Sequence, residues 1–354
     1  MIEKYSEIFL CPNCEGELSL KQSNLVCNDC NVIWSIKNDI PSFIEESDFA
    51  SYSLAPNMKE INLMAKQLGW RETIQGYSNS AENQDYTMEY ISSEARADFR
   101  FLLPTSNQSG SVVDIGSGWG NMSLAFARTA DQVVAIDTTP ENLEFIQIRA
   151  DQEGLKNIIT AQAEASCLPL RPNSFDIALL IGVLEWVAWG RPGDPQKLQQ
   201  KALKRIYESL RPGGCLYLSI ENRFSYKYFL GLKEPHTGLR FVSLLPYIIG
   251  NQYSRIVRHQ EYRELTYSPW ALKKLLRVAG FNQIDFMYPI PNYQNFRYIT
   301  DHSQPQISRF VLNQMRGHPK FSTPYYLAGF FSVILRLHKT LSPSFSVFAY
   351  KNYD

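Results

Sequence analysis

The chain lacks the segments that would carry it out of the cell or into a bilayer. Among its 354 residues, no apolar run approaches the roughly 18 residues that a membrane-spanning helix needs. Met1 to Leu10 carries acidic residues among its apolar ones, unlike a secretory signal. Net charge is absent too, because 35 Lys+Arg balance 35 Asp+Glu, and no dense Lys/Arg cluster appears. We therefore expect a cytoplasmic globular protein without the charge pattern of a dedicated nucleic-acid binder.

Cysteine is scarce, and its placement is informative. Four of the six cysteines form two C-x-x-C pairs, Cys11 with Cys14 and Cys27 with Cys30, with 12 residues between the pairs. Four thiolates at this spacing can surround one ion tetrahedrally. The alternative is two disulfides, which a reducing cytoplasm disfavours. Four thiolates leave no open coordination position, so the pattern predicts a structural Zn²⁺ that folds a segment too small for a large core.

The neutral total hides a strong asymmetry. Residues 1–220 hold 18 Lys+Arg and 28 Asp+Glu (18 − 28 = −10), and residues 221–354 hold 17 and 7 (17 − 7 = +10). All five histidines also lie in the second part. Two solvated surfaces of opposite sign would explain this. The alternative is that the C-terminal part faces an anionic partner, such as a phosphate-bearing substrate, a nucleic acid or a lipid surface.

A glycine-rich turn stands between two apolar runs. Val112 to Ile115 runs into Gly116-Ser117-Gly118-Trp119-Gly120, and Val133 to Ile136 ends in Asp137. This is the layout of a nucleotide-binding βαβ unit, in which the turn glycines admit a ligand and the acid accepts from ribose hydroxyls. A dinucleotide fold favours G-x-G-x-x-G, whereas the third glycine here comes one position early, at Gly120.

The segments that follow alternate between helix and strand patterns. Nearly unbroken apolar runs such as 174–182 suit strands buried on both faces of a parallel sheet. The expected elements are helix 140–153, strand 158–161, strand 174–182, helix 195–210, strand 215–220, helix 268–278, strand 283–287 and strand 344–350. The pattern predicts an α/β fold.

Residues 110 to 221 resemble the class I S-adenosylmethionine-dependent methyltransferases. The resemblance rests on D-x-G-x-G-x-G beginning at Asp114, on an acid, Glu164, four residues before Leu168-Pro169, and on Arg-Pro-Gly-Gly at 211–214. The family more often has Asp where this chain has Glu164. The resemblance implies a Rossmann-like seven-stranded sheet whose last strand is antiparallel. It also implies S-adenosylmethionine as cofactor.

The same resemblance implies a set of cofactor-binding residues. Asp137 would hold the ribose hydroxyls, Glu164 would accept from the adenine amino group, and the glycine turn would cradle the methionine part with Asp114 near its ammonium. The full set is Asp114, Gly116, Ser117, Gly118, Asp137, Thr138, Glu164, Ala165 and Gly182.

The residues after the fourth and fifth strands should specify the methyl acceptor. Many family members carry Leu-Glu-His where this chain has Leu184-Glu185-Trp186, so a histidine base at that position is excluded. Glu185 would either close the site as a catalytic residue or cap the next helix. An Asp/Asn-Pro-Pro-Tyr/Phe motif, common in amide or adenine N-methylation, is absent there.

Two insertions, at about 222–265 and 289–341, are expected to form a substrate cap. Glu221-Asn222-Arg223 is the candidate substrate-binding segment, and Arg223 would bind a carboxylate or phosphate, or pair with Glu221 or Glu234. His236 is the candidate catalytic base, with a structural loop histidine as the alternative. These pieces resemble bacterial methyltransferases encoded with glycan or natural-product genes.

The apolar stretch 325–337 is too short to span a bilayer. We expect it to be a buried helix of the cap. The alternative is contact with a lipid-linked substrate or a membrane surface.

The expected organisation is a zinc ribbon at 1–46, a helical lid and linker at 47–110, and a methyltransferase domain at 111–354. The ribbon resembles methyltransferase activator subunits and ribbons fused ahead of some bacterial methyltransferases. The expected function is O-methylation of a sugar, a glycan precursor or another small molecule, which could be anionic or lipid-linked. Two alternatives stay open: an RNA base methyltransferase and a non-catalytic donor-binding scaffold.

Overall fold

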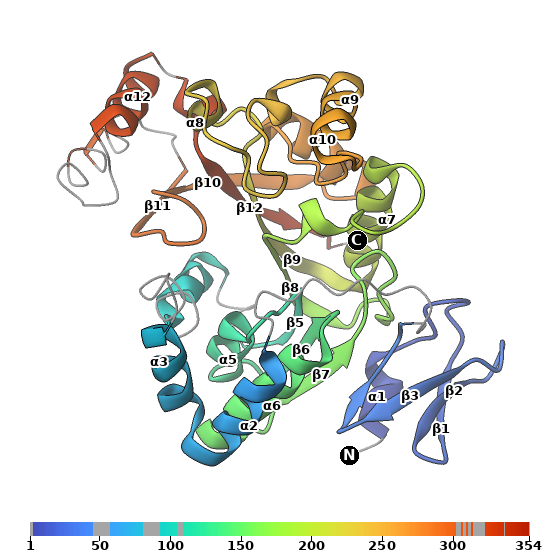
Figure 1. Cartoon of the computed structure of the whole chain (residues 1–354). Coiled ribbons are helices and arrows are strands. Elements are labelled where there is room, and N and C mark those ends of the chain that lie inside the picture. Colours follow the sequence, from blue (N-terminus) through green and yellow to red (C-terminus); the bar gives the residue numbers. More distant parts are fainter. Residues whose placement is uncertain are drawn as a thin grey trace. The chain divides into compact units, whose positions relative to one another are not determined.

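The structure, a computed structural model, describes residues 3–44, 57–80, 93–104 and 109–301, and in the last part 306, 309–310, 313, 323–335 and 337–353. These residues form two compact units. Unit 1 comprises Met1–Leu179, Arg205–Leu216 and Lys351–Asp354, and unit 2 comprises Leu180–Lys204 and Tyr217–Tyr350. Figure 1 follows the chain by colour and labels its elements. Parts of the expected lid (47–56 and 81–92) and of the second insertion lie outside the described residues.

A mixed eight-stranded sheet organises the fold, with the strand order β11-β10-β12-β9-β8-β5-β6-β7. β5, β6 and β7 pair in parallel, whereas β10 pairs antiparallel with β12. This confirms the expected Rossmann-like α/β sheet. The strands are β5 (Ser111–Ile115), β6 (Gln132–Asp137), β7 (Ile158–Gln162), β8 (Phe175–Ile181), β9 (Leu210–Glu221), β10 (Gln283–Ile290), β11 (Tyr298–Thr300) and β12 (Ser344–Tyr350).

One strand exceeds the expected seven. β11 pairs antiparallel with β10 at the edge of the sheet, through Tyr288–Thr300 and Ile290–Tyr298. It belongs to the second insertion, whose sequence carries no strand signal that distinguishes it from a loop. The hairpin of β10 and β11 at the edge of the sheet could therefore not be predicted from the sequence.

The helices of unit 1 that flank the parallel strands are α5 (Asn121–Ala127) and α6 (Pro140–Glu153). α6 spans the residues that the sequence predicts, because Pro140 occupies its first turn and Gly154 closes it with φ 71°. Arg149 of α6 is buried, lies 4.1 Å over the ring of Trp70 and donates a 2.6 Å hydrogen bond to the carbonyl of Trp119. α6 thus connects the glycine turn to the helical segment that precedes the sheet.

That preceding segment contains α2 (Met58–Leu68), α3 (Trp70–Ser80) and the 3₁₀ helix η2 (Glu94–Leu102). These elements give the expected lid and linker at 47–110 its helical content within the described residues. Apolar side chains of α2 and α3 share a core with Trp119 and Phe145, whose rings meet edge-on at 5.6 Å. The segment therefore packs beside the glycine turn.

The N-terminal module holds α1 (Glu3–Ile8) and a separate antiparallel sheet of β1 (Leu18–Lys21), β2 (Asn24–Cys27), β3 (Ile33–Lys37) and β4 (Ile40–Pro41). Its small core contains Phe9, Trp34 and Phe43. The module is attached to the edge strand β7, because Phe43 donates its amide hydrogen to the carbonyl of Gln162 at 2.8 Å.

Unit 2 contains most of α7 (Pro195–Ser209) and the elements of the first insertion: α8 (Tyr226–Phe229), η5 (Val242–Leu244) and α9 (Tyr247–Arg258). The 3₁₀ helix η4 (Leu184–Trp186) follows β8. α10 (Pro269–Ala279) begins where expected, since the Ser268 hydroxyl accepts from the amide of Ala271. α12 (Thr323–Ile334) and α13 (His338–Leu341) come from the second insertion.

The expectation that 325–337 is a buried helix is wrong for several of its large apolar side chains. Leu327, Phe331 and Leu335 are 46%, 56% and 63% exposed. α12 carries apolar residues on nearly all of its faces. The elements packed against it cover only part of this apolar surface. In the described part of the chain, no helix is both long enough and apolar enough to cross a membrane.

Candidate functional site

The glycine turn (residues 116–120) follows β5 and leads into α5. Its three glycines have positive φ values of 71°, 53° and 85°, which L side chains rarely adopt. A Cβ at Gly120 would lie 2.7 Å from Ile146 of α6, whereas a Cβ at Gly118 would meet nothing within 4 Å. Gly120 is therefore needed for packing, and Gly118 borders open space where a ligand can approach the backbone.

Asp137 ends β6 directly beside this open space. Its Oδ2 accepts from the amide of Gly118 at 2.8 Å, and its Oδ1 accepts from the amide of Thr139 at 2.8 Å and from Asn142 at 3.3 Å. The carboxylate is 9% exposed, and this burial raises its pKa. Two backbone amides thus fix its orientation, and a ligand diol could add to the free capacity of Oδ2.

Asp114, the last but one residue of β5, is a second buried carboxylate in the same unit. Its Oδ2 accepts from the hydroxyl of Ser123 at 2.6 Å. Burial, reinforced by the charge of Asp137, raises the pKa of Asp114 to about 6. A cationic group bound nearby would favour its ionised form.

The remaining residues expected to bind the cofactor lie on adjacent loops. Glu164 is half-buried after β7 and accepts from the hydroxyl of Ser166 at 3.1 Å. Thr138 and Ala165 are half-buried as well. The Ser117 hydroxyl is buried and has no hydrogen-bond partner among the described residues. An open turn, an orphaned hydroxyl and two oriented carboxylates fit the adenosine and amino-acid parts of S-adenosylmethionine.

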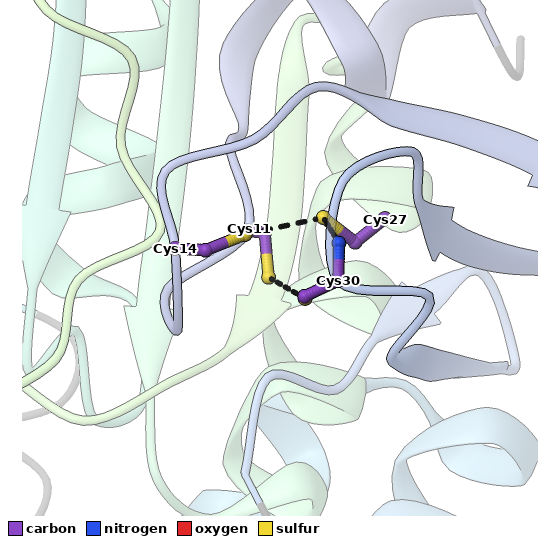
Figure 2. A group of neighbouring side chains, drawn as sticks. All are labelled: Cys11, Cys14, Cys27 and Cys30. Atoms are coloured by element: carbon purple, nitrogen blue, oxygen red, sulfur yellow. Dashed lines mark hydrogen bonds between the residues drawn. The ribbon is translucent and has the colours of Figure 1, made fainter.

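Four cysteine side chains converge in the N-terminal module, as Figure 2 shows. Their Sγ atoms all lie within 4.8 Å of one another, with Cys11 to Cys30 at 3.7 Å and Cys14 to Cys27 at 3.4 Å. Ligands around a tetrahedral zinc with Zn–S bonds of about 2.3 Å lie about 3.8 Å apart. All four cysteines are free thiols, so the disulfide alternative is not what the structure contains.

Both cysteine pairs sit on the same kind of turn. The amides of Glu15 and Asn31 donate to the carbonyls of Cys11 and Cys27 at 2.8 and 3.1 Å, and both residues have left-handed φ values of 60° and 58°. A Cβ at Gly16 would lie 2.9 Å from the sulfur of Cys27. The backbone is therefore folded closely around the four-cysteine cluster, in a geometry that fits a bound metal ion.

The four-cysteine module contacts the loop that carries Glu164. Leu10 donates its amide hydrogen to the carbonyl of Pro169 at 2.8 Å, and the thiol of Cys167 lies 3.6 Å from the carbonyl of Pro12, within the first cysteine turn. Arg171 adds an ion pair to Glu17 at 2.6 Å. The module thus braces the loop expected to bind adenine, a link that the sequence does not reveal.

Unit 2 brings a second group of candidate residues together, which we call the acidic–histidine cluster: Glu185, Glu221, Glu234 and His236. The Nε2 atom of His236 lies 3.4 Å from Oε1 of Glu185 and 3.6 Å from Oε2 of Glu221. Its Nδ1 atom contacts Oε1 of Glu234. The ring of Trp186 meets the imidazole edge-on, with centroids 5.0 Å apart. Both residues expected to be catalytic, Glu185 and His236, are therefore neighbours.

Burial sets the charges of this cluster. Burial by itself lowers the pKa of His236, but the nearby carboxylates of Glu185, Glu234 and Glu221 outweigh it and raise that pKa to about 11. Burial, followed by the charge of Glu185, raises the pKa of Glu221 to about 7. Burial alone would raise the pKa of Glu234, but the imidazole of His236 and the hydrogen bonds from Thr237 outweigh burial and lower that pKa. The imidazole of the free chain is therefore cationic at neutral pH.

Neighbouring residues orient two of these carboxylates. Oε2 of Glu234 accepts from the amide and hydroxyl of Thr237, at 2.7 and 2.8 Å. The Tyr293 hydroxyl donates to Oε1 of Glu221 at 3.0 Å. A Cβ at Gly182 would lie 2.6 Å from the same hydroxyl, so glycine there lets Tyr293 approach. Gly182 remains a predicted cofactor residue, and this contact gives it a packing reason as well.

The other two residues of the expected substrate segment have intramolecular contacts. Asn222 is fully buried and donates to the carbonyls of Thr340 and Ser342 at 2.7 and 2.9 Å. Arg223 donates to the carbonyls of Ser243 and Leu245 at 2.9 and 2.8 Å. Their substrate-binding role stays a prediction, and their visible role is to hold the two insertions in place.

Sequence reasoning missed Glu234 and Tyr293 as members of the cluster. Glu234 carried a usable signal, because it stands two residues before His236 in a short Glu-Pro-His-Thr-Gly turn. Tyr293 carried none, since it lies 72 residues from Glu221 in the chain.

Comparisons with known proteins find relatives that match the central part of the chain. Residues 113–218 match the family model of a methyltransferase domain. The chain is 32% identical over 201 residues to a ubiquinone biosynthesis O-methyltransferase of Cereibacter sphaeroides, covering 57% of this chain and 71% of that protein. It is also 32% identical over 97 residues to an uncharacterised methyltransferase of Bacillus subtilis, covering 27% of this chain and 34% of that one.

A solved structure of similar fold is phosphoethanolamine N-methyltransferase 2 of Haemonchus contortus in complex with S-adenosyl-L-methionine. The TM-score is 0.44 at 16% identity. The match covers 83% of this chain and 60% of that chain, so this chain spans less than two thirds of that protein.

Proposed function

Because this chain belongs to the class I S-adenosylmethionine-dependent methyltransferases, we propose that it methylates a hydroxyl oxygen of a small molecule. The O-methyltransferase named in ubiquinone biosynthesis, which it resembles over 57% of its length, supports an oxygen acceptor. The observation that carries the proposal is the buried acidic–histidine cluster. A sugar or glycan precursor is the acceptor we favour from the sequence, and other small hydroxylated molecules such as phenols are the further acceptors to test.

S-adenosylmethionine supplies a methyl group that is already activated by its sulfonium. The residues of unit 1 bind and orient it: Asp137 holds the ribose hydroxyls, Glu164 the adenine amino group, and the glycine turn with Asp114 the amino-acid part. What remains for the protein is to align the acceptor oxygen with the methyl group and to remove its proton.

Glu185 is the residue we propose as proton acceptor. It is fully buried, and neither of its oxygens accepts a hydrogen bond within the described residues. His236 cannot take a proton while its ring is already cationic, and the surrounding carboxylates keep its pKa near 11. We therefore assign His236 the role of stabilising Glu185 and Glu221, and treat the earlier expectation of a histidine base as the competing hypothesis.

The test is transfer of an isotope-labelled methyl group to panels of sugars, phenols and RNA, read by mass spectrometry. A labelled methyl ether on a sugar or phenol supports the proposal, whereas a label only on RNA bases would replace it with the RNA alternative. Donor binding without label on any panel would favour the non-catalytic scaffold. Glu185→Gln should lower turnover about 10²- to 10⁴-fold, the usual contribution of a general base.

Two controls test whether the loss of turnover is specific to the carboxylate of Glu185. Glu261→Gln removes an exposed carboxylate that pairs with Arg255 and Arg263, and exposed pairs contribute little. It should leave turnover unchanged. Donor affinity should be nearly the same in both variants, because all the predicted donor residues except Gly182 lie in unit 1, whereas Glu185 and Glu261 lie in unit 2. Equal turnover in the wild type and Glu185→Gln would rule out the proposed base.

We also propose that the four-cysteine cluster binds Zn²⁺. Four converging thiols with tetrahedral spacing support this choice over a harder cation. With all four positions filled by protein, the ion would have no opening for a substrate, so its role would be structural. Zinc content near one ion per chain, lost in Cys27→Ser, is the expected result of elemental analysis.

A further inference from the structure

The spacing within the acidic–histidine cluster is too long for good hydrogen bonds. The Nε2 atom of His236 lies 3.4 Å from Glu185 and 3.6 Å from Glu221, whereas charge-assisted N–H···O bonds are about 2.7–2.9 Å long. Ligands that share a tetrahedral ion with bonds of about 2.1 Å lie about 3.4 Å apart. The three ligand atoms all fall within 4.8 Å of one another.

Three carboxylate oxygens of this cluster lack hydrogen bonds among the described residues. Both oxygens of Glu185 and Oε2 of Glu221 are buried without a hydrogen bond among the described residues. Glu185 itself is 0% exposed. Burial of a carboxylate without a partner costs free energy. A bound cation would supply the partner that the side chains alone do not supply.

The outer contacts have the form that metal sites use. The Nδ1 atom of His236 contacts Glu234, which fixes the ring and leaves Nε2 to point at the other two carboxylates. Glu234 is held in turn by Thr237, and Glu221 by Tyr293. His236 and Glu221 are therefore each oriented by a neighbouring side chain, whereas Glu185 is not oriented in this way among the described residues.

The charges of the cluster are unbalanced. Three carboxylates face His236, and Lys227, which interacts electrostatically with Glu221, is the further cation recorded for that carboxylate. With all three carboxylates ionised and both cations charged, the group carries a net negative charge. A divalent cation would reverse this imbalance.

We propose that Glu185, Glu221 and His236 bind one divalent metal cation, with Glu234 orienting the imidazole. The cation would take the place of the Nε2 proton of His236, which would be released to solvent on binding. Two carboxylates and one imidazole suit Mn²⁺, Fe²⁺ or Zn²⁺. Three protein ligands leave at least one coordination position open, as in catalytic metal sites. Cation binding does not depend on the proposed function, but its role does: the cation would bind the acceptor oxygen and favour its deprotonated form.

Mn²⁺ is the probe of choice, because it is paramagnetic and competes poorly for the thiolates of the four-cysteine cluster. Titration of the full-length chain with MnCl₂, followed by loss of the free-ion electron paramagnetic resonance signal, should show one site. Glu185→Gln should weaken binding at least about tenfold, and Glu234→Gln about 10- to 100-fold as a residue behind the ligand. Glu261→Gln should bind Mn²⁺ as the wild type does.

Elemental analysis of each protein closes the test. A second zinc per chain that blocks Mn²⁺ and disappears in Glu185→Gln would support the site equally. Absence of bound metal in the wild type at millimolar Mn²⁺, or unchanged binding in Glu185→Gln, would overturn the proposal. Unfolding temperature in the wild type, which needs no variant to fold, should rise with Mn²⁺.

The outcomes also separate this proposal from the proposed function. Mn²⁺ binding without methylation of any hydroxyl would refute the proposed O-methylation and leave the proposal of the metal site intact. Methylation by a chain that binds no Mn²⁺ or second zinc would leave the function with Glu185 as an unaided base.

Discussion

At the scale of single residues, the groups to which we assign the chemistry of this chain are buried carboxylates near strand ends. Asp114 and Asp137 stand near and at the ends of β5 and β6, and Glu185 and Glu221 follow or end β8 and β9. A carboxylate without solvent must find donors or cations. Backbone amides and a hydroxyl serve Asp137 and Asp114, whereas Glu185 has no such donor. This difference is why we assign donor binding to Asp114 and Asp137 and propose reactivity for Glu185.

Asp137→Ala should weaken S-adenosylmethionine binding by about two orders of magnitude. The variant loses the acceptor of the ribose hydroxyls, and hydrogen bonds to charged groups contribute about 1.5–3 kcal/mol each. It also frees the amides of Gly118 and Thr139 that now hold the turn. Calorimetric titration measures the effect, with exposed Asp131→Ala as the matched control. Unchanged affinity in Asp137→Ala would refute the ribose role.

Asp114 should make donor binding depend on pH. Burial and the charge of Asp137 raise its pKa to about 6, so the free chain protonates Asp114 below that pH. A donor ammonium prefers the ionised form. Donor affinity should therefore be flat above about pH 7 and fall by up to tenfold per unit below pH 6, as one proton must leave on binding.

Titration calorimetry between pH 5 and 8 would check this pH dependence. Asp114→Asn should bind more weakly than the wild type at pH 8 and lose the slope below pH 6. A wild-type slope that persists in Asp114→Asn would assign the titration to another group.

At the scale of elements, the sequence predicts what local chemistry determines. α6 keeps its predicted ends because Pro140 and Gly154 fix them, and the turn after β5 follows from its glycines. The two cysteine turns follow from spacing alone. β11 could not be predicted, because it is a three-residue edge strand without a strand signal that pairs with β10. The contact of Tyr293 with Glu221 could not be predicted, because the two residues lie 72 positions apart in the chain.

Removal of zinc from the four-cysteine cluster should affect two elements at once. The first 44 residues should lose their structure, because their sheet has little core besides Phe9, Trp34 and Phe43. Donor affinity should fall several-fold, because the loop with Glu164 loses its contacts through Leu10 and Pro12. Circular dichroism and donor titration after chelation measure the two effects.

Cys167→Ala separates the two parts of this prediction. It keeps the four ligands and removes only the thiol contact to Pro12. The ribbon should stay folded and donor affinity should change by less than in the chelated chain. Full donor affinity after loss of the ribbon would show that the module has another role, such as partner docking.

For the whole molecule, the distribution of charge and exposed apolar side chains is the remaining feature to explain. Residues 221–354 carry 17 Lys+Arg against 7 Asp+Glu (17 − 7 = +10). The same part exposes Ile248 and Ile256 of α9 by 80% and 68%, and Phe331 of α12 by 56%. RNA would match the charge but not the isoleucines. An anionic lipid surface matches both, and lipid-linked acceptors would be found there.

Vesicle co-sedimentation tests this reading. The chain should bind phosphatidylglycerol vesicles, should bind phosphatidylcholine vesicles weakly, and should be released by high salt because surface attraction is screened. Ile248→Ser should reduce binding about tenfold, since burial of an isoleucine contributes about 1.5–3 kcal/mol. Leu63→Ser, at a 62% exposed position of α2 in the acidic part, is the matched control. If both variants bind like the wild type, or neither vesicle binds, the isoleucines are ordinary exposed residues and the acceptor is a freely diffusing molecule.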